Sequence, residues 1–302
     1  MLITFVSAIR DEQGGIENFI NNFHSKIAMS QYLKQDKKQL VLVEDGSSDK
    51  TIQKVINSNY IDDVLLIKLS SSRGQAQALE VGCHVVRHSD VIVMLDADLS
   101  HPFEEALMMI QNVLKGDDIA QGVRLDFHRN QFRNIAARSF GKYLELCFRI
   151  PYTSQNTYFR AISGKVLLRL TKRRPTFWSY LRLNSREIKR VRSSYVEFVA
   201  PKRLSDKSKY PFFRLVKFGL KGIVTTSRPS VISLNILFYL LIPIFLVGHA
   251  TLAIPTVILT LIVGISVRYY QGKHREFPSR IVHFIHVGKN MSVDSNFEGN
   301  AV

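Results

Sequence analysis

Short apolar runs alternate with helical patterns over residues 2–124, and this order restricts the possible folds more than any other feature of the chain. Each apolar run has the length of a strand, and each of the first four is followed by a segment of helical periodicity. Alternation of this kind predicts an α/β fold, with a mostly parallel sheet and helices on both faces. The expected strands are residues 2–8, 39–45, 63–70, 91–98 and 118–124, and the expected helices are residues 15–29, 47–58, 74–88 and 102–115.

Carboxylates lie where two of these strands should end, and ligands of such sheets bind beyond the carboxyl ends of the strands. Asp96 and Asp98 stand one residue apart after an apolar run. Two like charges this close repel each other, so a site that keeps both ionised holds a cation. Oxygen ligands suit Mg²⁺ or Mn²⁺ that bridges a diphosphate. Asp45 is expected to contact a nucleobase or ribose, whereas Ser47, Ser48 and Asp49 are expected to cap a helix.

A long uncharged stretch lies near the other end of the chain. Residues 229–267 contain no Asp, Glu, Lys or Arg, which is enough for two spans of about 20 residues each. The alternative is a buried helical hairpin, although core helices rarely lack a polar face for so long. Basic residues flank both ends of the stretch, and His249 lies in the turn, which predicts that both ends are cytoplasmic. The preceding residues 209–228 alternate apolar and basic side chains and predict an interfacial helix.

The formal net charge of +16 suggests a polyanionic partner. Nucleic acid, an anionic membrane surface and a phosphorylated substrate would all fit this charge. No nucleic-acid-binding motif is recognisable, and the basic segment at 209–228 explains much of the excess through the membrane. Nucleic acid is therefore not expected as a partner.

Three motifs together resemble the family 2 glycosyltransferases with a GT-A fold. They are VEDGSSDKT at 43–51, RGQAQALEVG at 73–82 and MLDADLSHP at 94–102, in this order and spacing. Three later segments resemble motifs of dolichol-phosphate mannose synthase and the bacterial polyprenyl-phosphate glycosyltransferases. These segments are GVR at 122–124, YFRAISGKVL at 158–167 and KRLSDKSKY at 202–210.

The resemblance implies a set of site residues. Asp96 and Asp98 would be the metal ligands, with Asp98 as the catalytic residue, and Ser100 stands where the family often has a metal-touching Gln. Asp206 replaces a Gly of the family pattern in the 202–210 segment. The nucleotide-sugar would contact Ser7, Ile9, Asp11, Val43, Asp45, Asp96, Ala97, Asp98 and Arg124, and the phosphates of donor and acceptor would contact Arg124, Arg203 and Lys209.

The implied reaction is metal-dependent transfer of a sugar from a nucleotide-sugar to a membrane polyprenyl phosphate, with inversion at the anomeric carbon. A lipid phosphate is already an anionic nucleophile, so it needs cations to position it and no general base. A glycan or another lipid hydroxyl is the alternative acceptor and would require a base. An aspartyl phosphatase also uses an Asp-x-Asp after an apolar strand, but it would leave the 43–51 motif without a role.

The expected organisation has four parts, with a GT-A domain at 1–208 and an interfacial helix at 209–228. A two-helix transmembrane hairpin at 229–270 and a cytoplasmic tail at 271–302 follow. Residues 281–287 alternate apolar and polar side chains. This part of the tail is expected either to add a strand or to mediate assembly, for example into a homo-oligomer. The expected location is a bacterial inner membrane, with the catalytic domain on the cytoplasmic side.

Overall fold

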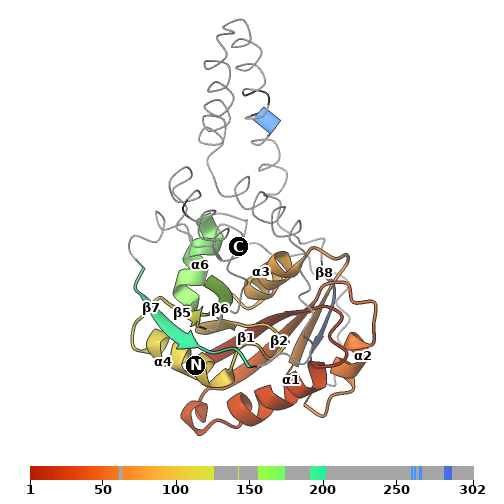
Figure 1. Cartoon of the computed structure of the whole chain (residues 1–302), viewed down its shortest axis with the longest axis horizontal. Coiled ribbons are helices and arrows are strands. Elements are labelled where there is room, and N and C mark those ends of the chain that lie inside the picture. Colours follow the sequence, from red (N-terminus) through yellow and green to blue (C-terminus); the bar gives the residue numbers. More distant parts are fainter. Residues whose placement is uncertain are drawn as a thin grey trace, which may run out of the picture.

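The described part of the computed structural model contains one mixed sheet (Figure 1). Its strand order is β7-β5-β6-β4-β1-β2-β3-β8, and eight strands take part. The structure describes residues 1–60, 64–125, 142, 156–173, 191–201, 260, 262, 265–266 and 282–287. The strands are β1 (Leu2–Ile9), β2 (Lys37–Glu44), β3 (Val64–Leu69), β4 (Val91–Met94), β5 (Ile119–Arg124), β6 (Asn156–Ser163), β7 (Ser193–Phe198) and β8 (Val282–Val287).

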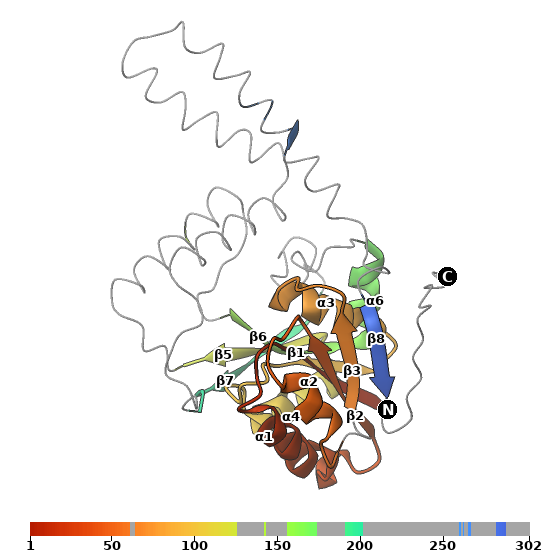
Figure 2. The same ribbon diagram turned by 90° about the vertical axis from the view of Figure 1, so that its right-hand side faces the viewer.

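Helices cover both faces of the sheet, as the alternation of apolar runs and helical patterns predicts. Helices α1, α2 and α4 lie on one face, and α3 and α6 lie on the other (Figure 2). Their bounds are α1 (Ile16–Phe23), α2 (Thr51–Ile56), α3 (Gln75–Val85), α4 (Phe103–Leu114) and α6 (Gly164–Arg173), with a π-helical turn η1 (His24–Ala28) and a 3-10 turn η2 (Gln31–Leu33) between α1 and β2.

Two apolar clusters fill the space between the sheet and these two helical layers. The first includes Phe5 of β1, Phe19 of α1 and Phe103 of α4. The second includes Val43 of β2 and Leu79 of α3 on the opposite face. Strand residues supply both clusters because successive side chains of a strand point to opposite faces. The central strands are therefore largely apolar on both sides, with a few buried polar side chains such as Thr4 and Ser7 of β1.

The sheet is less uniformly parallel than the sequence pattern predicts. Strands β1, β2, β3 and β4 pair in parallel, and β5 pairs in parallel with β7. Strand β6 is antiparallel to both β4 and β5, so it reverses direction between them. Two reversals cancel, so the carboxyl ends of β4 and β5 lie at the same edge of the sheet as those of β1, β2 and β3.

The tail contributes the last strand of the sheet. Strand β8 is antiparallel to β3, with Ile285 opposite Ile67. The alternation at residues 281–287 therefore corresponds to a strand that joins this sheet. Because β8 covers the outer side of β3, it satisfies an edge that would otherwise expose a row of unpaired backbone groups.

The part of the chain that the structure describes contains no helix long and apolar enough to cross a membrane. The predicted interfacial helix at 209–228 lies outside the described residues. The predicted hairpin at 229–270 lies outside them too, except for the isolated positions 260, 262, 265 and 266.

Candidate active site

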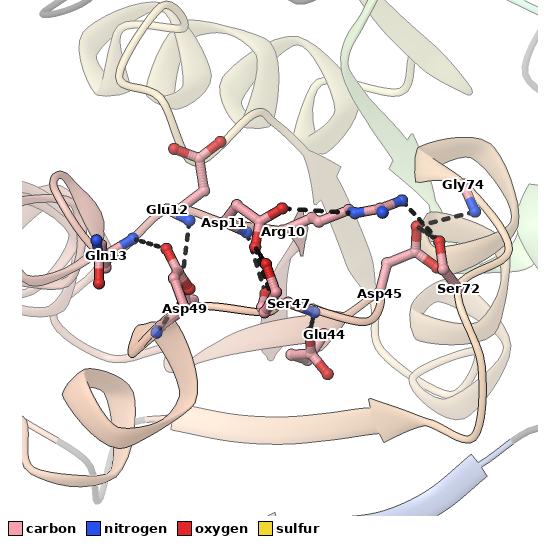
Figure 3. A network of polar contacts seen from close by, with 12 residues as sticks. Arg10, Asp11, Glu12, Gln13, Glu44, Asp45, Ser47, Asp49, Ser72 and Gly74 are labelled. Carbon is pink, nitrogen blue, oxygen red and sulfur yellow. Dashed lines mark hydrogen bonds and ion pairs between the residues drawn. The ribbon is translucent and has the colours of Figure 1, made fainter.

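Two loops at the carboxyl edge of the sheet are joined by polar contacts (Figure 3). The first loop follows β1 and contains Asp11, and the second follows β2 and contains Ser47 and Ser48. The Asp11 carboxylate accepts hydrogen bonds from the Ser48 amide at 2.8 Å and from the Ser48 hydroxyl at 3.1 Å. In return, the Asp11 amide donates to the Ser47 hydroxyl at 3.1 Å. Asp11 has a φ of 51°, a left-handed conformation that Asp tolerates better than most residues.

Asp49 fastens the same two loops to the start of α2. Its Oδ1 accepts the Thr51 amide at 2.9 Å and the Thr51 hydroxyl at 2.5 Å, and its Oδ2 accepts the Gln13 amide at 3.1 Å. Burial raises the pKa of the Asp49 carboxyl, but these hydrogen bonds from Thr51 and Gln13 lower it, and the net pKa is below the ordinary value. The N-cap of α2 is Lys50, without a side-chain cap hydrogen bond, so the expected cap by Ser47, Ser48 or Asp49 is wrong. Asp49 instead closes a local turn two residues before Thr51.

Asp45 connects the end of β2 to the loop before α3. Its side chain is 2% exposed. Its Oδ1 accepts the Arg73 amide at 2.5 Å, and its Oδ2 accepts the Gly74 amide at 2.8 Å. The Ser72 hydroxyl adds a third hydrogen bond at 3.2 Å, and the Arg10 guanidinium donates to this hydroxyl at 2.8 Å. Backbone donors of the neighbouring loop therefore occupy both oxygens of Asp45.

Glycine at position 46 permits this close approach of the two loops. Gly46 has a φ of 79°, which L side chains rarely adopt. A Cβ atom at this position would lie 3.1 Å from the Cβ of Ser72. The side chain of Glu44, just before this turn, is fully buried and accepts the Ser47 amide. The VEDGSSD motif thus forms a tight turn whose carboxylates accept hydrogen bonds from backbone N–H groups of this loop and the next.

Asp96 follows β4 and is held by side chains. Its Oδ1 accepts a hydrogen bond from the Gln75 amide nitrogen at 2.7 Å. Its backbone N–H donates to Nδ1 of His101 at 2.9 Å. The Nε2 atom of the same imidazole lies 3.8 Å from Oδ2 of Asp96. The Asp96 side chain is 24% exposed, so it is partly accessible at the sheet edge.

Asp98 follows Asp96 by two residues in the same loop. Its Oδ1 accepts the Ser100 amide at 3.0 Å, which closes a local turn of the kind that Asp favours. Leu99 between them has a φ of 58°. A bulky residue in this left-handed region is strained, and such strain concentrates at functional sites. The turn places two partly exposed carboxylates, Asp96 and Asp98, within one short loop.

The two carboxylates suit a divalent cation that is shared with a substrate. Among the described residues, no group of three or more His, Cys, Asp or Glu side chains forms a metal cluster. Mg²⁺ is commonly held by one or two carboxylates together with substrate phosphates, and not by a complete cage of protein ligands. The Asp96–Asp98 loop fits that mode, because it offers two oxygen-bearing side chains at a partly open edge.

The other residues expected at the site fall into three groups. Ser7, Ile9 and Val43 are fully buried in the sheet, and Ala97 is 4% exposed. Arg124 is the last residue of β5 and is half-buried at the edge that holds Asp96. The expected phosphate-binding residues Arg203 and Lys209, together with Asp206, lie outside the described residues.

Sequence reasoning missed two contacts of Asp96. Gln75 lies in the RGQAQALEVG motif and His101 in the MLDADLSHP motif, but the sequence pattern assigns no role to either residue. One feature of the sequence could have indicated the contact with Gln75. This residue is a polar side chain at the start of an expected helix, and that helix begins at the sheet edge where the Asp-x-Asp loop lies. The sequence could not indicate the contact with His101, because the aromatic rings that pack on its imidazole belong to Phe159 and Phe198, which are distant in the sequence.

Comparison with known proteins identifies related sequences. Residues 10–187 match Glycosyl transferase family 2. An uncharacterized glycosyltransferase of Bacillus subtilis, YkcC, is 28% identical over 195 residues, which cover 63% of this chain and 58% of that protein. The undecaprenyl-phosphate 4-deoxy-4-formamido-L-arabinose transferase of Salmonella paratyphi B is 26% identical over 238 residues, which cover 75% of this chain and 68% of that protein.

Solved structures share the fold. Glucosyl-3-phosphoglycerate synthase from Mycobacterium tuberculosis, in complex with Mn²⁺, UDP and glucosyl-3-phosphoglycerate, matches with a TM-score of 0.53 and 15% identity. The match covers 74% of this chain and 77% of that chain. The same enzyme with Mn²⁺ and UDP-glucose matches with a TM-score of 0.50. At this identity the likeness establishes a GT-A-like α/β fold.

Proposed function

The chain belongs to glycosyl transferase family 2, a family of transferase enzymes, and on this basis we propose that it moves a sugar from a nucleotide-sugar to a membrane polyprenyl phosphate. The proposed reaction inverts the anomeric carbon and requires Mg²⁺ or Mn²⁺. The observation that carries this proposal is the Asp96–Asp98 loop at the carboxyl edge of the sheet, in which Gln75 donates to the Asp96 carboxylate and His101 accepts from the Asp96 backbone N–H. Family membership supports glycosyl transfer over the aspartyl phosphatase alternative.

Asp96 and Asp98 are the proposed ligands of the divalent cation and the donor diphosphate, with Asp98 as the catalytic residue. When bound, the cation would offset the negative charge that develops as the nucleoside diphosphate leaves. The mycobacterial structures that share the fold contain Mn²⁺ with UDP or UDP-glucose, which supports the choice of metal and donor class.

The proposed nucleotide pocket lies between the loops after β1 and β2. Asp11 is the most accessible of its expected members, because its side chain is 44% exposed. Asp45 would contact the base only if its carboxylate oxygens accept hydrogen bonds from the base in addition to those from the Arg73 and Gly74 amides. Ser7, Ile9, Val43 and Ala97 would contribute through backbone atoms or by supporting the pocket floor, since their side chains are buried.

The proposed acceptor is a lipid phosphate. One relative of this chain is a transferase that acts on undecaprenyl phosphate, according to its name. A phosphate nucleophile needs cations more than it needs a base. Arg124 lies at the same edge of the sheet as Asp96 and is the proposed cation among the described residues, with Arg203 and Lys209 as further proposed phosphate contacts.

We propose that the chain meets its acceptor at a membrane, through the interfacial helix at 209–228 and the hairpin at 229–270. Strands β7 and β8 flank this stretch in the sequence, and both belong to one sheet. Any part of the intervening chain that enters a bilayer must therefore leave it on the same side. This constraint requires an even number of crossings and supports two spans, with the catalytic domain and the tail both cytoplasmic.

The decisive experiment compares two acceptors that differ in one group. The full-length protein in lipid nanodiscs is incubated with a panel of radiolabelled nucleotide-sugars and either polyprenyl phosphate or the corresponding polyprenol. We expect one nucleotide-sugar to label the lipid phosphate, no label on the alcohol, and loss of transfer in EDTA that Mg²⁺ or Mn²⁺ restores. Labelling of the alcohol alone would favour a hydroxyl acceptor, and full activity in EDTA would contradict the metal-dependent mechanism.

A further inference from the structure

His101 is a buried histidine whose contacts converge on Asp96. Its side chain is 5% exposed. The imidazole stacks on the ring of Phe159 at a centroid distance of 4.6 Å and an interplanar angle of 4°. The ring of Phe198 meets it edge-on at 5.6 Å. Phe159 lies on β6 and Phe198 on β7, so two later strands fix the plane of a ring that belongs to the loop after β4.

The hydrogen bond to the Asp96 backbone determines which nitrogen of His101 carries the proton. A backbone N–H can only donate, so Nδ1 of His101 must accept this bond and carry no proton. The ring proton of the neutral imidazole then lies on Nε2. Nε2 lies 3.8 Å from Oδ2 of Asp96, beyond hydrogen-bond length, and its N–H bond points away from the Nδ1 side of the ring that contacts Asp96.

We infer that His101 is a positioning residue for Asp96: its fixed ring holds the Asp96 backbone through Nδ1 and thereby fixes where the Asp96 side chain starts. Gln75 holds one carboxylate oxygen at 2.7 Å. Asp96 is thus held both at its backbone and at its carboxylate before any ligand arrives. This inference deepens the proposed function, on which it rests, because it explains how this chain presents one of its two proposed metal ligands.

The alternative is that His101 only fills space between Phe159 and Phe198. Two substitutions separate the two roles. His101→Phe keeps an aromatic ring for the stack but removes both nitrogens. His101→Asn removes the ring but places an oxygen acceptor where Nδ1 stands, since both atoms are three bonds from Cα. A packing role favours Phe over Asn, whereas a positioning role favours Asn over Phe.

His24→Phe provides a matched control. His24 also stacks on an aromatic ring, that of Tyr60, at 3.7 Å and 12°. It lies in η1, between α1 and β2, away from the Asp96–Asp98 loop. Loss of this second stacked histidine should leave the behaviour of the loop unchanged.

The test uses the full-length protein and two measurements that do not depend on turnover. Hydrogen–deuterium exchange of a peptide that begins several residues before Asp96, such as residues 91–101, reports whether the Asp96 amide is held. Electron paramagnetic resonance of free Mn²⁺ reports the affinity for the metal alone. We expect His101→Phe to exchange faster at this peptide and to bind Mn²⁺ about 10- to 100-fold more weakly, as for other residues that orient metal ligands. His101→Asn and His24→Phe should stay close to wild type.

The outcomes separate this inference from the proposed function. Wild-type exchange and Mn²⁺ affinity in a folded His101→Phe protein would overturn the positioning role. If His101→Phe does not fold, His101→Asn decides: retained protection of the peptide supports the role, and its loss rejects it. If wild-type protein takes up no Mn²⁺, the metal-dependent function fails, while the exchange comparison of the variants still decides the role of His101.

Discussion

The carboxylates after β2 and those after β4 lie at the same edge of one sheet, but they are held by different groups. Backbone amides of neighbouring loops donate to Asp45 and Asp49. The Asp96 carboxylate, by contrast, accepts from the Gln75 side chain, and Asp98 accepts the Ser100 amide of its own loop. Asp45 and Asp49 therefore join three loops of the fold, whereas Asp96 is held by a side chain and Asp98 by its own loop.

This difference indicates which carboxylates serve the fold and which serve a ligand. A carboxylate surrounded by backbone N–H groups cannot exchange these donors for a ligand without loosening the loops that supply them. A partly exposed carboxylate that is held by a side chain, as Asp96 is, or by its own loop, as Asp98 is, can add a cation to its existing contacts. We therefore expect substitutions after β2 to lower stability and substitutions after β4 to abolish activity.

The largest expected effect is that of Asp98→Asn. The amide keeps an acceptor for the Ser100 N–H but removes the charge needed at the donor diphosphate. We expect the rate of sugar transfer to fall by about 100- to 1,000-fold, with a thermal midpoint close to wild type. Transfer assays and thermal unfolding of the same preparation measure both. A variant with near-normal transfer would remove Asp98 from the proposed mechanism.

Asp45→Asn should show the opposite pattern. Its new NH₂ group would face the Arg73 and Gly74 amides, so at least one buried donor loses its partner. The expected loss of stability is about 1–3 kcal/mol, seen as a lower thermal midpoint. Mn²⁺ affinity of the folded protein should change little. An unchanged midpoint together with weakened Mn²⁺ binding would reverse the distinction between the two loops.

The smallest effect is expected for Asp49→Asn, and it should depend on pH. The native pKa of Asp49 lies below its ordinary value of 3.8, so its charge stabilises the folded state above this value. That contribution is lost as pH falls through the lower native pKa. Asn keeps an oxygen acceptor for the Thr51 amide, so we expect a loss of less than about 1 kcal/mol at pH 7. The difference in thermal midpoint from wild type should shrink below about pH 3.8, and a constant difference would argue against a charge effect.

Much of the sheet can be predicted from local pattern, because continuous apolar runs identify buried strands. The runs at 39–45 and 91–98 correspond to β2 and β4. The position of β6 between β4 and β5 could not be predicted this way. Its antiparallel pairing depends on contacts between segments that are distant in sequence, and periodicity carries no information about strand order. Strand β7, with its alternation of exposed and buried residues, was also missed.

The residue types of the candidate site could be predicted from the sequence, but the contacts that hold each residue could not. An Asp-x-Asp after an apolar strand indicates where two carboxylates will lie. It does not indicate that Asp45, with a similar position after β2, has its oxygens occupied by the Arg73 and Gly74 amides. Nor does a His-Pro pair indicate a positioning histidine, because Phe159 comes from another strand of the folded sheet.

One measurement tests most directly the claim that the carboxylates after β4 bind the metal and the donor. Mn²⁺ is titrated into full-length protein, with and without UDP as a probe, and free Mn²⁺ is followed by electron paramagnetic resonance. Wild type and Asp49→Asn should each bind about one Mn²⁺ per chain, more tightly with a bound nucleoside diphosphate. The double variant Asp96→Asn/Asp98→Asn should lose this site. Wild-type Mn²⁺ affinity in the double variant would contradict the claim.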